Sequence, residues 1–405
     1  MRVYIITANW GSGGPGSIAA DLYNIILNHG DECKFAYARE SIPNNINSYR
    51  IGSMLDVYSH VLISRIFDNA GFLSSKATKR LIDDIENYKP DLINIHNPLG
   101  YSINVELLLN YIRDKAIPTV WTLHDCWTFT GHCITGLCHR LKTGCGDCPR
   151  KCEYPKSVFL DRSAKNFLRK KKCFSNIPNI SFVGPSNWIC NLAKESFLRE
   201  YEITHIPNGI DLSVFRPKQS NLVDEFELKN HIVLLSVASY WSKHKGLEYL
   251  LKLMERLDDK FRLVIVGKVN NSVKKRKRSN ILYIDRTTNR QELVNWYSLA
   301  DIFVNPTVGD NFPTVNIEAL ACGTPVVTFN TGGSGEMIGD CGEVVEKGNI
   351  IEMDAAIHRC LKKKISDKEC RKQAMAYDSF ARYDEYIRYF QTIIERSNTK
   401  CMDRL

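Results

Sequence analysis

The chain has 405 residues, of which 44% are hydrophobic and 24% charged, and its formal net charge at pH 7 is +9. This length predicts two or three domains, and this composition excludes a disordered chain. No apolar run approaches the ~18 residues that a membrane-spanning helix needs, and the N-terminus lacks the long apolar core of a signal peptide. We therefore expect a globular protein of the cytoplasm.

The first half of the chain alternates short apolar runs with helical patterns. Strands are predicted at residues 3–8, 92–96, 119–123 and 180–183, and Ser186 is placed to cap a helix. Short continuous apolar strands of this kind are typical of a parallel sheet that is covered on both faces.

A glycine-rich segment, Gly11-Ser-Gly-Gly-Pro-Gly16, follows the first strand and is predicted as a turn. Gly13, Gly14 and Gly16 allow the backbone to approach a ligand closely. Their spacing formally matches a dinucleotide fingerprint, but no convincing acidic residue follows at the expected distance. We interpret the segment as a loop that faces the phosphates of a ligand, and a simple turn is the alternative.

The segment from residue 124 to 152 combines a histidine with a cysteine cluster. His124 follows a strand at the carboxyl edge of the sheet, where ligands bind; a structural histidine is the alternative. Cys133, Cys138, Cys145 and Cys148 have the spacing of a structural zinc site. The spare candidate ligands are His132, His139, Cys126 and Cys152. A reducing compartment favours metal over disulfides, and free thiols are a further alternative.

The second half repeats the α/β alternation. Strands are predicted at residues 232–238, 263–266, 281–284, 302–305 and 326–329, after a linker-like junction, HIPNGIDLSVFRP, at 205–217. The tail from Tyr383 to Ile394 has one apolar helical face, which predicts packing on a domain or, alternatively, contact with a membrane.

Two carboxylates lie around a predicted helix start between residues 300 and 336. Asp310 lies on the loop before this helix, and Glu318 lies one turn inside it. The helix start leaves backbone N–H groups from Phe312 to Val315 without helical partners, and its dipole favours an anion. The pattern predicts a bound phosphate there, with Asp310 available to sugar hydroxyls and Glu318 to a ribose.

That segment, ADIFVNPTVGDNFPTVNIEALACGTPVVTFNTGGSGE, resembles the acidic motif of retaining glycosyltransferases of family four, with Asp310 in place of the first glutamate. The segments VGPSNW (183–188), IPNGID (206–211) and VASYWSKHKGLEYL (237–250) resemble other parts of that family in the same order. TLHDCWTFTGHC, GCGDCP and the downstream DRS (161–163) are similar to its colanic acid and capsular polysaccharide type.

The resemblance implies a GT-B architecture: two Rossmann-like, doubly wound domains facing a central cleft. The first domain would span residues 1–205 on the acceptor side, with a cysteine-rich insertion at 126–152. The second would span 206–380 and bind the nucleotide sugar. The amphipathic helix at 381–405 would cross back to the first domain.

The resemblance also implies a reaction. A retaining, metal-independent hexosyltransferase would move a sugar from a UDP- or GDP-linked donor to a glycan or lipid-linked glycan acceptor in surface polysaccharide biosynthesis. Lys245, Asp310, Glu318 and His124 would form the catalytic set. Residues implied to bind the donor are Gly13, Gly14, Gly16, Asn311, Phe312, Pro313, Thr314 and Val315. No cofactor would be required, with zinc only structural.

One position departs from the family pattern. Many relatives carry an arginine six positions before the lysine, where this chain has Ser239, and Lys243 or His244 are the candidate replacements.

Two other functions remain open. A nucleotide-sugar epimerase of similar fold is one, although no convincing acid–base set accompanies His124. A basic binding protein is the other, because residues 274–278 read KKRKR and residues 170–172 read KKK. No nucleic-acid-binding motif accompanies these runs, so we expect no nucleic acid partner. A basic face also allows peripheral contact with the anionic inner face of the cell membrane.

Overall fold

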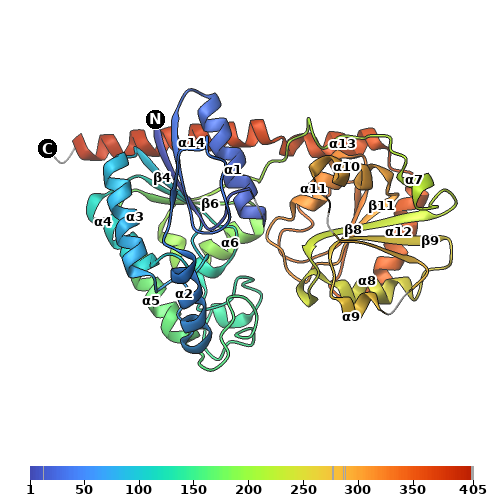
Figure 1. Cartoon of the computed structure of the whole chain (residues 1–405), viewed down its shortest axis with the longest axis horizontal. Helices are drawn as coiled ribbons and strands as arrows, with labels where there is room; N and C mark the ends of the chain where they lie inside the picture. The colour runs from blue at the N-terminus through green and yellow to red at the C-terminus, as the bar shows by residue number, and fades with distance from the viewer. Residues whose placement is uncertain (12, 276–277, 286, 288, 403–405) are drawn as a thin grey trace. The chain divides into compact units, whose positions relative to one another are not determined.

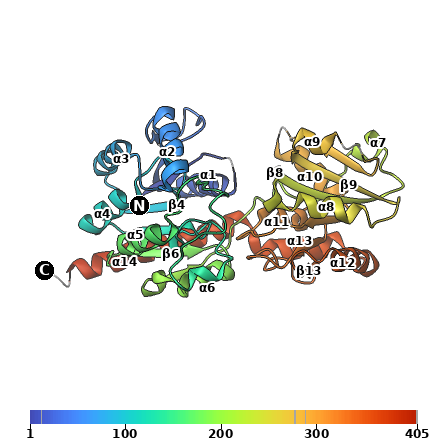
Figure 2. The ribbon, with the colours of Figure 1, turned by 90° about the horizontal axis from the view of Figure 1, so that it is seen from below.

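The computed structural model describes residues 1–11, 13–275, 278–285, 287 and 289–402. The chain divides into two compact units, drawn from two directions in Figure 1 and Figure 2. Met1–Pro207 and Arg382–Leu405 form the first unit, and Asn208–Ala381 form the second. The chain passes from one unit to the other after residues 207 and 381. The sequence predicted these boundaries after residues 205 and 380.

The first unit is built on a parallel sheet of seven strands in the order β3-β2-β1-β4-β5-β6-β7. The strands are β1 (Arg2–Thr7), β2 (Glu32–Tyr37), β3 (Ser48–Arg50), β4 (Leu92–Asn97), β5 (Thr119–Thr122), β6 (Ile180–Gly184) and β7 (Ile203–His205). The order reverses direction between β1 and β4, which is the switch point where α/β sheets bind ligands.

Helices cover both faces of this sheet, as expected for short apolar strands. They are α1 (Gly13–Asn28), α2 (Met54–Phe67), α3 (Ser75–Tyr88), α4 (Val105–Lys115), α5 (Ser163–Phe174) and α6 (Asn187–Lys194). Alternate residues of β1 enter opposite cores. Val3 and Ile5 pack with α1 and the C-terminal helix, whereas Tyr4 and Ile6 pack with α3 and α4.

The second unit has a parallel sheet of six strands in the order β10-β9-β8-β11-β12-β13. The strands are β8 (Ile232–Tyr240), β9 (Phe261–Lys268), β10 (Ile281–Ile284), β11 (Ile302–Asn305), β12 (Val326–Phe329) and β13 (Gly342–Val345). The order reverses between β8 and β11, so this sheet has a switch point of its own.

The helices of the second unit are α7 (Leu222–Glu225), α8 (Leu247–Met254), α9 (Asn271–Lys274), α10 (Arg290–Leu299), α11 (Thr314–Ala321), α12 (Ile350–Lys363) and α13 (Asp367–Ala374). One core joins the sheet to α10, α11 and α13, and another joins it to α8 and α12. Figure 1 shows α10 and α11 above this sheet and α8 below it.

The C-terminal helix α14 (Ser379–Met402) includes the predicted apolar stretch from Tyr383 to Ile394 and begins two residues before the predicted helix at 381–405. Its predicted apolar face lies in the core of the first unit: Tyr383, Tyr386 and Phe390 are fully buried beside Val3, Ile5 and α1. This burial replaces the predicted alternative in which the same face lies on a membrane. Among the described residues, no helix combines the length and the hydropathy needed to cross a membrane.

Candidate functional site

Two connections meet at the switch point of the second unit. The chain leaving β8 forms a short 3-10 turn at Lys243–Lys245, and the chain leaving β11 forms the loop that leads into α11. Because β8 and β11 are parallel neighbours, both connections leave from the same edge of the sheet.

Backbone contacts hold these two connections together. The N–H of Val308 donates to the carbonyl of His244 at 2.9 Å. Gly246 has φ of +80°, and a Cβ there would lie only 2.0 Å from the carbonyl oxygen of Pro306. Any other residue at position 246 would push the two connections apart, so this glycine sets where Lys245 lies.

Lys245 and Asp310, both predicted from the sequence, form an ion pair. The Lys245 Nζ lies 2.6 Å from Asp310 Oδ2, and the side chains are 39% and 23% exposed. The N–H of Gly333 donates to the carbonyl of Asp310 at 3.1 Å, which fixes the backbone of the loop at this residue. Asp310 is therefore fixed at its backbone while its carboxylate stays accessible.

Glu318 lies further along α11, where it accepts a hydrogen bond of 2.9 Å from the Tyr297 hydroxyl. Burial raises the pKa of Glu318, while the bond from Tyr297 and the nearby Arg290 oppose this shift. Burial, together with the adjacent Glu318 carboxylate, also raises the pKa of Tyr297. Tyr297 thus remains a neutral donor that orients Glu318.

The five predicted donor-binding residues from Asn311 to Val315 surround the start of α11. Pro313 occupies the N-cap position, and in the described part of the chain no side chain caps this helix. Asn311, Phe312 and Pro313 are buried, whereas Thr314 and Val315 are half-buried. Pro313 has no N–H, so the first backbone N–H groups of the helix are those of Thr314 and Val315, four and five residues after Asp310.

The glycine segment of the first unit differs from its predicted conformation. Helix α1 begins at Gly13, so Gly13, Gly14 and Gly16 lie in its first turn and not in a turn before it. Pro15 tolerates this position because the first turn needs no N–H from it. A Cβ on Gly16 would lie 3.0 Å from the Asn9 carbonyl oxygen, whereas Gly13 and Gly14 have open space around them.

His124 belongs to a hydrogen-bonded series of three side chains. The Nε2 of His124 lies 2.9 Å from His96 Nδ1, and His96 Nε2 lies 2.6 Å from Asn94 Oδ1. The Asn94 amide donates to the Val120 carbonyl, which leaves its oxygen to accept from His96. A neutral His96 must then accept from His124, so the proton of His124 is on Nε2 and its lone pair on Nδ1.

Burial determines the charge of both rings. It lowers the pKa of His124 to about 3, and burial together with His124 lowers the pKa of His96 well below its ordinary value. Both imidazoles are neutral at pH 7. This argues against His124 as a general base, because such a base needs a pKa near the working pH.

Cys133, Cys138, Cys145 and Cys148 lie in one loop between β5 and α5 and are all unpaired by disulfides. A thiol–thiol contact between Cys133 and Cys148 lowers the pKa of the first and raises that of the second. Among the described residues, no three His, Cys, Asp or Glu side chains are placed to hold a metal ion. The side chain of His139 lies outside the described residues.

The basic runs are not continuous solvated patches. Lys170 is 1% exposed. In the run at 274–278, Lys274 pairs with Asp285 and Arg278 pairs with Glu255. Arg276 and Lys277 lie outside the described residues. Lys170 therefore adds no exposed charge to the predicted basic face, because its ammonium group bonds to buried carbonyls.

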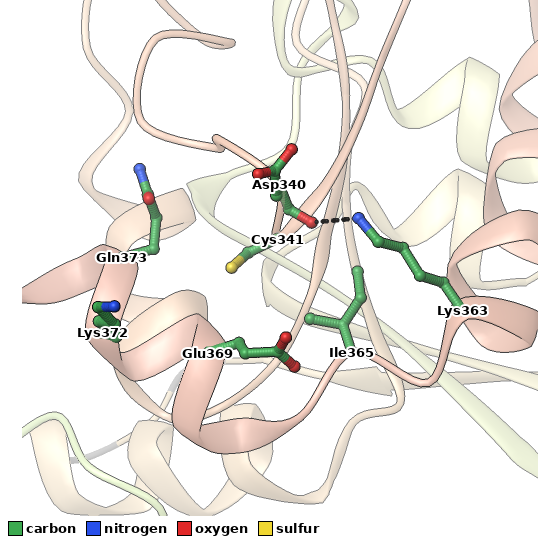
Figure 3. A pocket seen from close by; sticks show the side chains of 7 residues that line it. All are labelled: Asp340, Cys341, Lys363, Ile365, Glu369, Lys372 and Gln373. Atoms are coloured by element: carbon green, nitrogen blue, oxygen red, sulfur yellow. Dashed lines mark hydrogen bonds between the residues drawn. The ribbon is translucent and has the colours of Figure 1, made fainter.

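A cavity of about 350 Å³ in the second unit contains none of the predicted site residues. Figure 3 shows Lys363 donating to the carbonyl of Asp340 at its edge, with Glu369 and Lys372 on the opposite helix. The charges that line it are mixed, and the cavity offers no set of groups for sugar transfer.

Sequence reasoning missed three partners of the predicted residues: Asn94, His96 and Tyr297. Asn94 and His96 alternate along one predicted strand, so they share a face of the sheet. With His124 after a neighbouring strand, that spacing was a detectable signal. Tyr297 lies 21 residues from Glu318 on another helix, and no local pattern indicates the contact.

Residues 231–363 match the family model described as Glycosyl transferases group 1. The putative colanic acid biosynthesis glycosyl transferase WcaC of Escherichia coli K12 is 23% identical over 97% of this chain and 100% of its own length. The sucrose-phosphate synthase of Thermosynechococcus elongatus has a TM-score of 0.71 at 14% identity, covering 98% of this chain and 99% of the other. Anabaena Alr3699/HepE, solved with UDP and glucose, has a TM-score of 0.69 at 14% identity, covering 97% and 100%.

The family model lies within the second unit, whereas the matches to the relative and to the two solved structures extend over both units. Together with the two parallel sheets and their covering helices, they confirm the predicted GT-B architecture of two Rossmann-like domains.

Proposed function

We propose that the chain is a glycosyltransferase that transfers a sugar from a nucleoside-diphosphate donor with retention of configuration. The match of residues 231–363 to the glycosyl transferases group 1 model supports this activity. The acceptor is a glycan or lipid-linked glycan of surface polysaccharide biosynthesis. The relative named for colanic acid biosynthesis, which aligns over its whole length, supports this setting. The UDP and glucose bound to the Anabaena structure support a UDP-linked donor, with GDP as the alternative.

The observation that carries this proposal is the ion pair of Lys245 and Asp310 beside the start of α11. A departing nucleoside diphosphate gains negative charge, and a preorganised cation with backbone N–H groups stabilises that charge without a metal. Lys245 supplies the cation, and Phe312, Thr314 and Val315 supply the N–H groups. The same chemistry supports metal-independent transfer.

The ion pair also suggests how the donor is received. The diphosphate attracts Lys245 away from Asp310, and the released carboxylate then accepts hydrogen bonds from the donor sugar. Glu318, oriented by Tyr297, accepts hydrogen bonds from the ribose. For the second cation that Ser239 cannot supply, Lys243 is the exposed candidate in the same turn.

In the first unit we assign the remaining site residues by the same reasoning. Gly13 and Gly14, with open space around them at the start of α1, present backbone N–H groups to the donor. Gly16 permits the close approach of this helix to Asn9. His124, kept neutral by burial, lies beside the sugar of the donor or acceptor.

Peripheral membrane contact belongs to the same proposal, because the acceptor includes lipid-linked glycans. Helix α2 exposes Leu55, Tyr58 and Leu62 at 62% or more, and the nearby segment at 158–160 adds Phe159 at 70%. The N–H of Val158 donates to the carbonyl of Arg65, so this segment lies beside α2. Exposed apolar groups next to basic side chains are typical of a surface that binds anionic lipid. The protein would then work at the cytoplasmic face of the membrane.

A transfer assay tests the function. Purified protein is incubated with UDP- and GDP-sugars, with and without a glycolipid extract, and products are followed by mass spectrometry and NMR. We expect sugar to appear on the acceptor with the anomeric configuration of the donor, and nucleoside diphosphate to be released. An inverted product would refute retention, and epimerised donor without acceptor would favour the epimerase alternative.

A further inference from the structure

The cysteine loop, defined here as residues 131–150, brings sulfur atoms together although it has no regular helix longer than one turn. Cys133 contacts Cys148, and Cys145 interacts electrostatically with both Cys133 and Cys138. The four thiols, which lie within 15 residues of one another in the sequence, are thus also near one another in space.

Backbone N–H groups point at three of these sulfur atoms. The N–H of Gly131 donates to Cys145 Sγ at 3.2 Å. Cys133 receives N–H groups from Thr135 and Gly136, and Cys148 receives one from Arg150. Such donors stabilise a thiolate more than a thiol, and thiolate is the form that binds metal.

A buried cation lies against the same loop. The Lys170 Nζ donates to the carbonyls of Trp127 and Thr130, at 2.8 Å for Thr130, and the side chain lies over the Trp127 ring. In the part of the chain that the structure describes, Lys170 forms no ion pair with a carboxylate. Its negative neighbours are Asp125, Cys133, Cys145 and Asp68, with Asp125 the strongest. A buried ammonium is costly without opposite charge, and a metal–thiolate group carrying net negative charge would add to the charge that the two aspartates supply.

The flanks of the loop are fixed before any metal binds. Asp68 holds His132 Nδ1 at 2.6 Å, and Asp161 accepts the backbone N–H of Cys148. Between these anchors, Gly136, Gly144 and Gly146 have positive φ, which allows the loop to form tight turns.

We propose that Cys133, Cys138, Cys145 and Cys148 bind one Zn²⁺ as a structural site. The pairs Cys133-x₄-Cys138 and Cys145-x₂-Cys148 have the ligand spacing of such sites. Because the metal-free arrangement does not place three ligands for coordination, binding draws the sulfur atoms together and orders the loop. Each thiol that binds loses its proton to solvent.

The test measures metal in the purified full-length chain after gel filtration, with Cys145→Ser and Cys148→Ser as site variants. Cys152→Ser is the matched control, because Cys152 is exposed and only four residues beyond the site. We expect about one zinc per chain in the wild type and the control, and about none in the site variants. Cobalt substitution should give thiolate-to-metal absorption in the same two proteins.

Chelation of the wild type keeps the proposal testable if the site variants do not fold. Removal of zinc should lower the unfolding temperature of the first unit, and added zinc should restore it. Metal-free wild-type protein whose four thiols react freely, or which shows a disulfide among them, would overturn the proposal. Nucleoside diphosphate binding, which we assign to the second unit, is measured in parallel and should persist, so the two proposals fail independently.

Discussion

At the scale of single residues, the proposed site contains an ion pair whose two charged groups both remain accessible to a ligand. Lys245 and Asp310 pair across two connections of one sheet, and both remain partly accessible. An accessible ion pair contributes little to stability, about 0–1 kcal/mol. Its position at the switch point is therefore better explained by ligand binding than by folding.

Glu318→Gln tests the assignment of the ribose. A carboxylate that accepts from a ribose hydroxyl contributes about 1.5–3 kcal/mol, so the variant should raise the donor KM roughly tenfold or more. The same substitution should have little effect with a 2′-deoxy donor. Stability should be unchanged or higher, because burial raises the pKa of Glu318 and the amide carries no charge. An equal loss for both donors would contradict the role.

His124→Gln tests the neutral histidine through the pH dependence of unfolding. An unfolded histidine takes up a proton below pH ~6.5, whereas burial keeps His124 neutral until the pH approaches its pKa of about 3. The unfolded state then binds more protons, so acidification from pH 7 to 5 destabilises the wild type. This group should account for roughly 1–2 kcal/mol of that loss, and the variant should lose correspondingly less. Identical pH profiles in denaturant titrations would contradict the assigned charge.

At the scale of elements, the exposed face of α2 and its neighbouring segment gives the clearest prediction. Leu62→Glu combined with Phe159→Glu should reduce co-sedimentation with anionic vesicles at least tenfold, because two apolar contacts are lost and two negative charges added. Ile351→Glu is the control, since Ile351 is 67% exposed on α12 of the other unit. Unchanged vesicle binding by the double variant would exclude this face as the membrane contact.

The sequence predicted the fully buried strands well. It predicted partly buried strands and the start of helix α1 less well. Strands β10, β11 and β12 have the predicted bounds, since each is a continuous apolar run between turn residues. Strands β2, β3, β7 and β13 were not predicted, because their burial is partial and their apolar pattern is broken. Helix α1 begins earlier than predicted, because glycine and proline in a first turn look identical to a loop in sequence.

In the proposed site, too, local patterns could be predicted from the sequence and contacts between distant segments could not. The acidic motif and Lys245 could be proposed from the sequence because they are local patterns. The hydrogen bonds of Glu318 with Tyr297 and of His124 with His96 join distant segments, and only the fold brings them together. The burial of Lys170 was missed for a similar reason, since its carbonyl partners lie 40 or more residues away.

At the scale of the whole molecule, the two units use the same plan: a parallel sheet whose strand order reverses once. Helix α14 completes the first unit from the far end of the chain. Its Asn179–Ser397 hydrogen bond and the pair of Arg396 with Glu202 add polar contacts to the buried apolar face.

Phe390→Ala should therefore destabilise the first unit. Loss of a buried phenylalanine costs about 3–5 kcal/mol, which should lower that unit's unfolding temperature by roughly 10 °C. Phe380→Ala, at a 62% exposed position of the same helix, is the control and should change it little. Calorimetry that found equal effects for the two variants would show that the tail does not stabilise this unit.

Calorimetric binding of nucleotides tests the central claim most directly, because the proposed site recognises a diphosphate. UDP or GDP should bind the wild type at least tenfold more tightly than the corresponding monophosphate. Lys245→Ala should lose this preference, while Lys260→Ala, at an exposed lysine beside the start of β8 and away from the site, should keep it. Equal preference in wild type and Lys245→Ala, or no nucleotide binding by the wild type, would contradict the account.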